Sequence, residues 1–242
     1  MKVILIYMPI AFEFMFVKVF KSFMDMTGED VREKLAERGY RLKFYLSNKF
    51  PIDLNRNEAF DIAKKRFDAD LILCADGDQV FKKNTLLTLL GTLEDNPDAD
   101  AVTGVYFTKT FPHRAVVGKY SPWSDTLRSK EASLKSQGFI DKDGNQTLYF
   151  KHLQYFDVVQ PVDVFGLGCI LIRTSAFDKI QQPFTKYFNA YSTGGDYTFQ
   201  GHSEDMFLCH QFKKAGVKVL VNPKVVVGHM TSKVICGNEA ED

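Results

Sequence analysis

Residues Leu71 to Asp78 read LILCADGD, an apolar run that ends in two acidic residues. A short continuous apolar run bounded by turn formers is typical of a strand buried on both faces of a parallel sheet. Residues two apart in extended backbone point the same way, so Asp76 and Asp78 can face one ligand. Gly77 between them tolerates unusual dihedral angles and leaves room for a diphosphate. In open α/β sheets ligands lie beyond the carboxyl ends of the strands, which is where this pair lies.

Two carboxylates at one strand end are oxygen ligands of the kind that Mg²⁺ and Mn²⁺ prefer. Such sites keep coordination positions open for phosphate oxygens. The motif therefore predicts a divalent cation site. Asp and Gly are also common in solvated turns, and that alternative remains open when the motif is taken alone.

Apolar periodicity on both sides of this run predicts alternating strands and helices. The predicted strands are 3–7, 41–46, 71–75 and 101–107, and the predicted helices are 12–23, 28–39, 54–67 and 84–96. Asp53 is expected to cap the third helix. This order predicts one α/β domain over residues 1–242, with a mostly parallel central sheet flanked by helices and joined by right-handed crossovers.

The second half of the chain is less regular. Residues 108–160 carry Pro112, Pro122 and Gly138, and a long irregular segment in a compact domain tends to be functional. The elements predicted after it are an apolar run over 162–172, a helix over 203–215, and short strands around Val217 and Val225.

Composition excludes several classes of protein. Hydrophobic residues make up 45% and charged residues 25%, which argues against disorder and fibrous repeats. The formal net charge is +1, so a strongly basic nucleic-acid footprint is absent, although a local basic patch remains open. No run reaches the ~18 apolar residues of a membrane span. The apolar start over residues 2–8 is interpreted as the first buried strand rather than a signal peptide.

The cysteines form no CxxC pair. Cys74 and Cys169 lie in apolar runs, which predicts reduced, buried thiols. A cytoplasmic protein fits that pattern.

Two acidic residues, Glu204 and Asp205, follow Ser203 at the predicted start of a helix. Ser203 can cap the helix, and acidic residues in a first turn are favoured by the helix dipole. A catalytic role and this structural role remain equally open for the pair.

Two further features carry possible chemistry. His229 follows Gly228 at the end of an apolar run, and as a ligand it would suit Mn²⁺ better than Mg²⁺. A packed or exposed histidine is the alternative. Gly166 and Gly168 precede another apolar run, where glycines indicate either close backbone approach or a bulge.

In chain order these motifs are Asn55-Arg56-Asn57-Glu58-Ala59, Asp76-Gly77-Asp78, the Gly166/Gly168 loop, Glu204-Asp205 and Gly228-His229. The order resembles the GT-A fold glycosyltransferases, especially the family 2-like group. That group has an R-N-x-A helix, a D-x-D strand end, a glycine loop, an E-D helix start and a late His. The resemblance covers nearly the whole chain and is weakest over residues 108–160. It implies a Rossmann-like GT-A domain, with the nucleotide sugar bound by residues 1–107 and the acceptor by 108–242.

For the metal, the resemblance implies that Asp78 binds Mn²⁺ or Mg²⁺ directly and that His229 is the C-terminal ligand. Asp76 would contact the ribose, or the metal through water. The cation would bridge the donor diphosphate and stabilise the leaving nucleotide as a Lewis acid.

For the nucleotide, the resemblance places Arg56 near the diphosphate, and Gly77 is also assigned to donor binding. The strand ends at Tyr7 to Pro9 and at Ser47 would cradle the base and ribose. UDP is the expected nucleotide.

For catalysis, Asp205 matches the general base that takes a proton from an acceptor hydroxyl, with Glu204 beside it binding the acceptor or orienting the site. This arrangement would invert the anomeric centre. Gly166 and Gly168 would let the backbone approach the acceptor or the donor sugar.

The acceptor surface is expected to include Trp123, because aromatic faces stack on sugars and bases. His202 is also assigned there, although the family usually has a glycine element before the E-D pair, which leaves acceptor geometry open. The acceptor could be a saccharide, a protein, a lipid-linked sugar or a modified base in nucleic acid. Basic residues that would favour nucleic acid are Lys109, His113, Arg114 and Lys119.

Two other functions remain as alternatives. A nucleotidyltransferase also uses paired carboxylates and a metal, but it usually carries a glycine-rich basic loop after the first strand. Residues 7–12, YMPIAF, are neither glycine-rich nor basic. A non-catalytic nucleotide- or sugar-binding module on the same fold is the second alternative.

Overall fold

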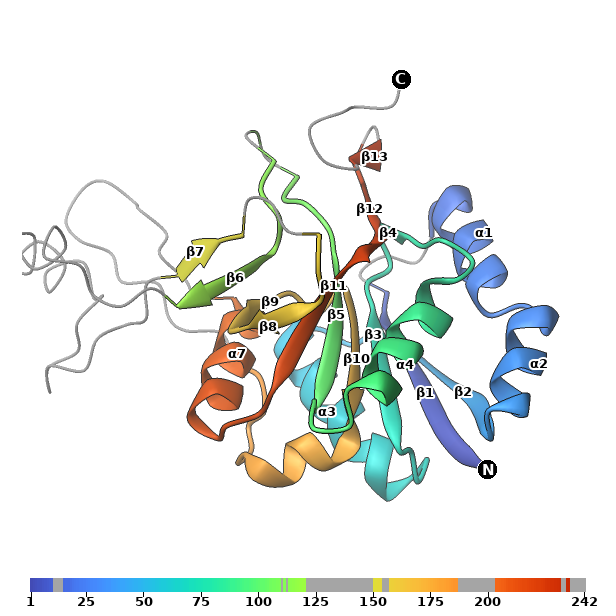
Figure 1. Ribbon diagram of the computed structural model, residues 1–242, viewed down its shortest axis with the longest axis horizontal. Helices are drawn as coiled ribbons and strands as arrows, with labels where there is room; N and C mark the ends of the chain where they lie inside the picture. The colour runs from blue at the N-terminus through green and yellow to red at the C-terminus, as the bar shows by residue number, and fades with distance from the viewer. Residues whose placement is uncertain are drawn as a thin grey trace, which may run out of the picture.

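The computed structural model describes residues 1–10, 15–109, 111, 113–120, 150–153, 157–186, 203–231 and 234–235. Within these residues the chain is built around a seven-stranded sheet in the order β2-β1-β3-β10-β5-β11-β8 (Figure 1). The strands are β1 (Lys2–Pro9), β2 (Tyr40–Ser47), β3 (Leu71–Ala75), β5 (Ala101–Val105), β8 (Gln160–Val162), β10 (Cys169–Arg173) and β11 (Val219–Val226).

Five of the seven strands of this sheet run in the same direction, as the sequence predicts. β1 pairs in parallel with β2 and β3, and β5 pairs in parallel with β11. β8 and β10 run antiparallel to their neighbours. The four strands predicted before residue 108 are confirmed as β1, β2, β3 and β5, and the α/β class with a mostly parallel sheet is confirmed with them.

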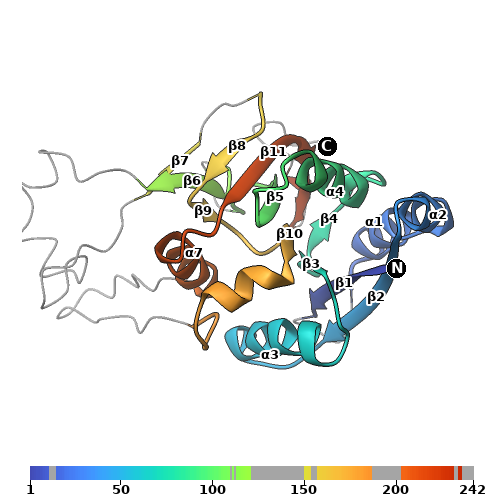
Figure 2. The ribbon, with the colours of Figure 1, turned by 60° about the horizontal axis from the view of Figure 1, so that its bottom comes forward.

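Helices cover both faces of the sheet (Figure 2). One face carries α3 (Ile52–Lys65), the 3-10 helix η1 (Thr174–Lys179) and α7 (Glu204–Lys214), and the other carries α1 (Val17–Met26), α2 (Glu29–Glu37) and α4 (Thr85–Asp95). Each face has its own core, because successive side chains of a strand point to opposite faces. Along β1, Leu5 packs with the α3 side, whereas Ile4 and Ile6 pack with the α1 side.

Several boundaries differ from the prediction. Pro51, not Asp53, is the N-cap of α3, so Asp53 lies inside the first turn. The two strands expected around Val217 and Val225 are the single strand β11, followed by β12 (Gly228–Met230). The helix expected over 12–23 is α1, which begins at Val17 and ends at Met26; Met15 and Phe16 are not helical, and residues 11–14 lie outside the described part.

β10 is inserted antiparallel between β3 and β5, with Ile170 opposite both Cys74 and Thr103. The apolar run over 162–172 is therefore not one strand but β8, β9 (Val164–Phe165) and β10. Because β10 runs against its neighbours, its first residue, Cys169, pairs with Ala75 at the carboxyl end of β3. This reversal brings the Gly166–Gly168 loop to the edge of the sheet where Asp76 and Asp78 lie.

Two small sheets flank the central one. β12 pairs with β4 (Gln79–Val80) and β13 (Val234–Ile235), and β6 (Val117–Tyr120) pairs with β7 (Phe150–His152) and β9. In the first, His229 lies opposite Gln79, the residue after Asp78. A three-residue strand near the C-terminus therefore returns to the end of β3.

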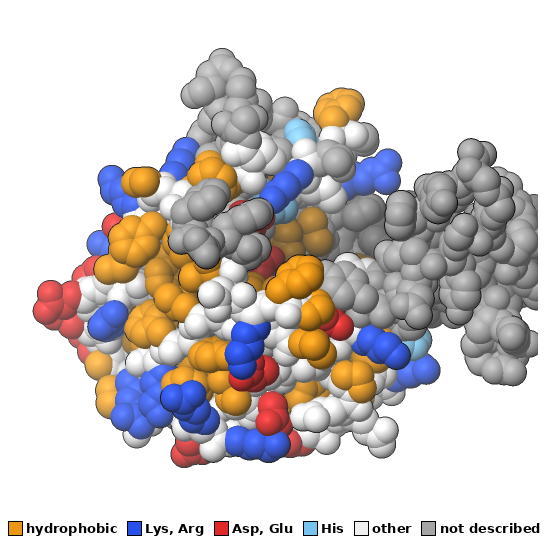
Figure 3. Space-filling view, turned by 180° about the vertical axis from the view of Figure 1, so that it is seen from behind, with side chains coloured by type: hydrophobic (Ala, Val, Ile, Leu, Met, Phe, Trp, Pro, Cys, Tyr) orange, Lys and Arg blue, Asp and Glu red, His pale blue; other side chains and the backbone are white. Residues whose placement is uncertain are grey.

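Cys74, Cys169 and Cys209 are free and buried, which confirms the prediction for Cys74 and Cys169. In the described residues no helix has the length and apolar character to cross a bilayer. The surface does carry exposed apolar side chains, seen among Lys and Arg on the back of the molecule (Figure 3). Those on or beside α1 are Phe16, Val17, Phe20 and Met24.

Candidate functional site

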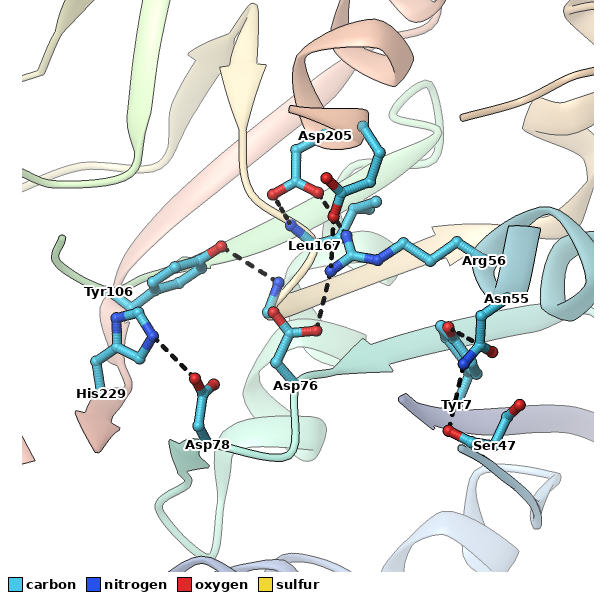
Figure 4. A network of polar contacts seen from close by, with 12 residues as sticks. Tyr7, Ser47, Asn55, Arg56, Asp76, Asp78, Tyr106, Leu167, Asp205 and His229 are labelled. Carbon is cyan, nitrogen blue, oxygen red and sulfur yellow. Dashed lines mark hydrogen bonds and ion pairs between the residues drawn. The ribbon is translucent and has the colours of Figure 1, made fainter. Parts of the chain in front are cut away.

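The carboxyl ends of the parallel strands bring together most of the described residues that the sequence singles out (Figure 4). Asp76 and Asp78 follow β3, Arg56 comes from α3, Asp205 from the first turn of α7, and His229 from β12. These residues are up to 173 positions apart in the chain (from 56 to 229). Their convergence follows from the crossover topology and the antiparallel insertion of β10.

Arg56 lies at the centre of three carboxylates. Its side chain is 5% exposed, and one guanidinium nitrogen lies 3.2 Å from Asp76 Oδ1 and 3.3 Å from Glu204 Oε1. The other terminal nitrogen donates to Asp205 Oδ1 at 2.5 Å. The expected position of Arg56 beside a donor diphosphate remains a prediction, because in the structure its terminal nitrogens face side-chain carboxylates.

The charge of this cluster is unbalanced, with three carboxyl groups around one guanidinium. Burial raises the pKa of Asp76 to about 6 against the opposing charge of Arg56. Burial, together with the neighbouring charge of Asp205, raises the pKa of Glu204 to about 7. The carboxylates in turn outweigh burial at Arg56 and raise its pKa well above the usual range. The cluster therefore gains protons near neutral pH, and Arg56 keeps its charge.

Asp205 is held at both oxygens. Oδ1 accepts from Arg56, and Oδ2 accepts from the backbone N–H of Leu167 at 3.3 Å. The side chain of Asp205 is 20% exposed, compared with 9% for Glu204. Of the two adjacent acids, Asp205 is thus the one that a bound molecule can reach. Ser203 is the N-cap residue of α7 but makes no capping hydrogen bond through its side chain.

Asp78 and His229 form a second pair beside the Arg56 cluster. His229 Nε2 lies 3.4 Å from Asp78 Oδ2. His229 Nδ1 lies 2.8 Å from the carbonyl oxygen of Phe107, and since a carbonyl only accepts, Nδ1 carries a proton. Nε2 and the Asp78 oxygen then need a proton or a cation between them.

Lys109 is a second partner of Asp78, with its ammonium 2.5 Å from Asp78 Oδ2. Burial alone would raise the pKa of Asp78, but hydrogen bonds with His229 and Lys109 outweigh it and lower the pKa to about 2. Asp78 is accordingly ionised across the physiological range, as a metal ligand must be.

The donor set of Asp78 and His229 fits a divalent cation of the Mn²⁺ kind. One imidazole nitrogen and one carboxylate leave the remaining coordination positions to phosphate oxygens and water. The hydrogen bond from Nδ1 to Phe107 fixes the tautomer and the ring orientation, as outer partners of metal-binding histidines do. No group of three His, Cys, Asp or Glu side chains that could hold a metal ion occurs within the described residues. Asp76 as a metal ligand therefore stays a prediction, and its Oδ1 faces Arg56.

The glycines at the site are explained by close packing inside the protein. A Cβ on Gly166 would lie 1.7 Å from the hydroxyl oxygen of Tyr106. A Cβ on Gly168 would lie 3.0 Å from Gln79 Nε2 and 3.2 Å from Asp76 Oδ2, and a Cβ on Gly77 would lie 3.0 Å from the carbonyl oxygen of Pro9. The predicted contacts of these glycines with substrate stay predictions.

The strand ends that were expected to hold the nucleotide rest on a buried polar network. Tyr7 is 1% exposed, and its hydroxyl donates to Asn55 Oδ1 at 3.0 Å. Asn55 Nδ2 donates to the carbonyl of Ser47 at 3.3 Å, and Ser47 pairs with Pro9 across β1 and β2. The buried Tyr7 side chain is thus linked through Asn55 to the end of β2, and any contact of Tyr7 with a nucleotide-sugar donor would have to involve its backbone.

Trp123 and His202, expected at the acceptor, lie outside the described residues. Three residues that the sequence reasoning did not assign to this site do lie in it: Tyr106, Phe107 and Lys109. Tyr106 accepts a hydrogen bond from the backbone N–H of Gly168 at 3.3 Å. All three lie within four residues of the end of β5 at Val105, whereas the predicted strand extended to residue 107. Lys109 was considered only as a basic residue that would favour nucleic acid, and its position just past a parallel strand was the available signal.

The comparisons with known proteins bear on the fold. No family model and no curated protein matches the chain. Among solved structures the chain is similar to the crystal structure of A197 from STIV, with a TM-score of 0.56 and 15% identity, over 99% of this chain and 95% of that chain. It also matches CMP:2-keto-3-deoxy-manno-octonic acid synthetase complexed with CTP, with a TM-score of 0.41 and 10% identity, over 98% and 94%.

The likeness to A197 shows a shared fold along nearly the whole chain. At 15% identity it says nothing about a reaction, and the second likeness is too slight to carry an argument. Membership of the family 2-like group is not confirmed by these comparisons and remains a prediction from the motifs.

Proposed function

We propose that the protein is a metal-dependent glycosyltransferase that moves a sugar from a UDP-linked nucleotide-sugar donor to a hydroxyl acceptor. The observation that carries this proposal is that two clusters of side chains, each containing aspartate, lie at one edge of the sheet. Asp78 with His229 forms one, and Asp205 with Glu204 around Arg56 forms the other. The first suits a divalent cation that would in turn bind a donor diphosphate, and the second suits a hydroxyl that must lose a proton.

Asp78 and His229 would hold the cation, with Mn²⁺ favoured over Mg²⁺ because of the imidazole. When bound, the metal would supply Lewis acidity that offsets charge on the departing diphosphate. Asp78 suits this role because it stays ionised, and His229 because Phe107 holds its Nε2 toward Asp78.

Asp205 would act as the general base. Its carboxylate takes the proton of the acceptor hydroxyl while the acceptor oxygen bonds to the anomeric carbon. The bond from that carbon to the diphosphate oxygen breaks, and the nucleoside diphosphate leaves with the electron pair. Attack from the side opposite the leaving group inverts the anomeric centre.

Arg56 and the Leu167 N–H would keep the Asp205 carboxylate in one orientation without covering it completely. Glu204 has a pKa near neutrality, about 7, but its side chain is more buried than that of Asp205, so its poorer access to an acceptor makes it less suited to take the proton, and it instead adjusts the charge around Arg56. Fixing the geometry of a base in this way reduces the reorganisation needed during reaction.

Binding of donors by the intact chain tests the proposal. A panel of nucleotide sugars is added with Mn²⁺ or with EDTA, and thermal unfolding is followed. A ligand present at 100 times its Kd stabilises the fold by about 2.7 kcal/mol, a shift of about 5–10 °C for a chain of this size. One donor should raise the Tm in Mn²⁺, and both EDTA and Asp78→Ala should abolish the rise. The proposal fails if no donor responds in any metal.

The product separates this proposal from the alternatives. A glycosyltransferase, given acceptor or water, releases a nucleoside diphosphate from a nucleotide sugar. A nucleotidyltransferase releases pyrophosphate from a nucleoside triphosphate, and a binding module releases neither. Anion-exchange chromatography of the same reactions, which separates products by their phosphate charge, distinguishes the three outcomes.

A further inference from the structure

The Asp78 carboxylate is already paired with a cation that belongs to the chain. Lys109 Nζ lies 2.5 Å from Asp78 Oδ2, the same oxygen that His229 Nε2 approaches at 3.4 Å. The ammonium therefore lies against the carboxylate oxygen that the proposed metal would use. A lysine ammonium and a divalent cation cannot both take the near side of one carboxylate oxygen without strong repulsion.

Lys109 is placed by the short segment that follows β5. Within this segment the carbonyl of Phe107 holds His229, and Tyr106 accepts from the Gly168 N–H. The backbone N–H of Thr108 is also held, donating to the carbonyl of Arg114 at 2.9 Å. The segment thus contacts two of the three predicted metal ligands, His229 through a carbonyl and Asp78 through an ammonium.

The Lys109 side chain has room to leave. It is 43% exposed, and Asp78 is 34% exposed, so water competes for both partners. Exposed lysine–carboxylate pairs contribute little and exchange easily. By contrast, Arg56 is 5% exposed and is bound to three carboxylates, so it cannot be displaced in the same way.

From this geometry we infer that Lys109 and the divalent cation compete for Asp78, so that Lys109 occupies the metal position until a cation displaces it. The inference rests on the proposed function, since it concerns the same metal site. Lys109 is accordingly a positioning residue that sets the affinity of the site for metal.

Direct binding of Mn²⁺ to the full chain, without nucleotide, tests the competition. Free Mn²⁺ is counted by its electron paramagnetic resonance signal during titration of wild type, Lys109→Met and Lys109→Arg. Lys64→Met is the matched control, because Lys64 is also paired with an aspartate and is 42% exposed, but lies on α3 away from Asp78. Removing an exposed ion-pair partner should tighten Mn²⁺ binding by about 1.5- to 5-fold in Lys109→Met. Lys109→Arg should stay near wild type.

Salt adds a second readout that a merely structural effect would not produce. At about 1 M ionic strength the screening length is about 3 Å, so the exposed pair weakens in wild type. The ratio of Mn²⁺ affinities between Lys109→Met and wild type should therefore fall toward one. The thermal unfolding of each variant checks that it is folded at the temperature of the titration.

The outcomes separate the inference from the function on which it rests. Tighter binding in Lys109→Met, but not in Lys64→Met, supports the competition. Equal affinities in all four proteins overturn the inference while leaving the metal site in place. An absence of Mn²⁺ binding in every variant overturns the metal site itself and the inference together.

Discussion

Replacing Arg56 by methionine should destabilise the protein strongly, and more so at high pH. The change removes the cation and keeps a side chain of similar length, so Asp76, Glu204 and Asp205 are left facing one another. All three contact Arg56 in the structure, and its side chain is 5% exposed. Removing one partner of a buried ion pair typically costs about 3–5 kcal/mol, because the remaining charges stay buried without compensation.

The pH dependence follows from the carboxyl groups. Asp76 and Glu204 already have raised pKa values of about 6 and 7 with Arg56 present, and losing Arg56 raises them further. A group whose folded-state pKa lies above the unfolded value stabilises the fold at low pH, and this contribution is lost as pH rises through the folded-state pKa. One extra proton held by the folded variant recovers about 1.4 kcal/mol for each pH unit. The loss in free energy of unfolding caused by Arg56→Met should thus be largest near pH 8 and should become smaller toward pH 5.

Urea unfolding of wild type and Arg56→Met at the two pH values measures this difference. Arg38→Met is the matched control, because Arg38 pairs with Glu94 on the surface at 30% exposure. The control should change the free energy of unfolding by no more than about 1 kcal/mol at either pH. If Arg56→Met costs as little as the control, or the same at both pH values, then the three carboxylates are not held together by Arg56 as described.

Two further predictions concern packing and titration. Gly166→Ala should destabilise by about 1–3 kcal/mol, because its Cβ would overlap the Tyr106 hydroxyl. In α4 a Cβ on Gly91 would have its nearest neighbour 3.9 Å away, so Gly91→Ala should instead stabilise the protein by about 0.5–1 kcal/mol. Thermal unfolding of both variants measures these changes, and equal effects of the two substitutions would contradict the packing argument. Glu204→Gln should lose less stability than wild type as pH rises from about 5 to 8. Glutamine resembles the protonated acid and does not titrate, whereas Glu204 has a pKa raised from 4.5 to about 7; equal slopes of stability against pH in the two proteins would rule this out.

Local pattern predicted the parts of the fold that depend on local order. The run 71–75 became β3, and the amphipathic pattern near 54–67 became α3, shifted by two residues at its start and end. The position of β10 was not accessible in the same way, because a strand that joins a sheet between two others is selected by partners far away in the sequence. Its apolar residues fit a parallel or an antiparallel neighbour equally well.

The candidate site shows the same division. Asp78 and His229 lie together as the motif order implied, and Asp205 lies at the start of its helix. The partners of these residues could not be predicted, because each contact depends on side-chain direction in the folded chain. Arg56 faces carboxylates, and the Tyr106 hydroxyl lies close against Gly166.

In the reaction we propose, Asp205 takes a proton during transfer from a nucleotide sugar. The most direct measurement is nucleoside diphosphate release in Mn²⁺, for wild type, Asp205→Asn and Glu204→Gln, with the donor first identified by binding. Asp205→Asn should keep donor affinity and lower kcat by about 10²- to 10⁴-fold, the usual contribution of a general base, while Glu204→Gln retains most activity. Equal release by wild type and Asp205→Asn, or a loss of kcat only in Glu204→Gln, would contradict the account.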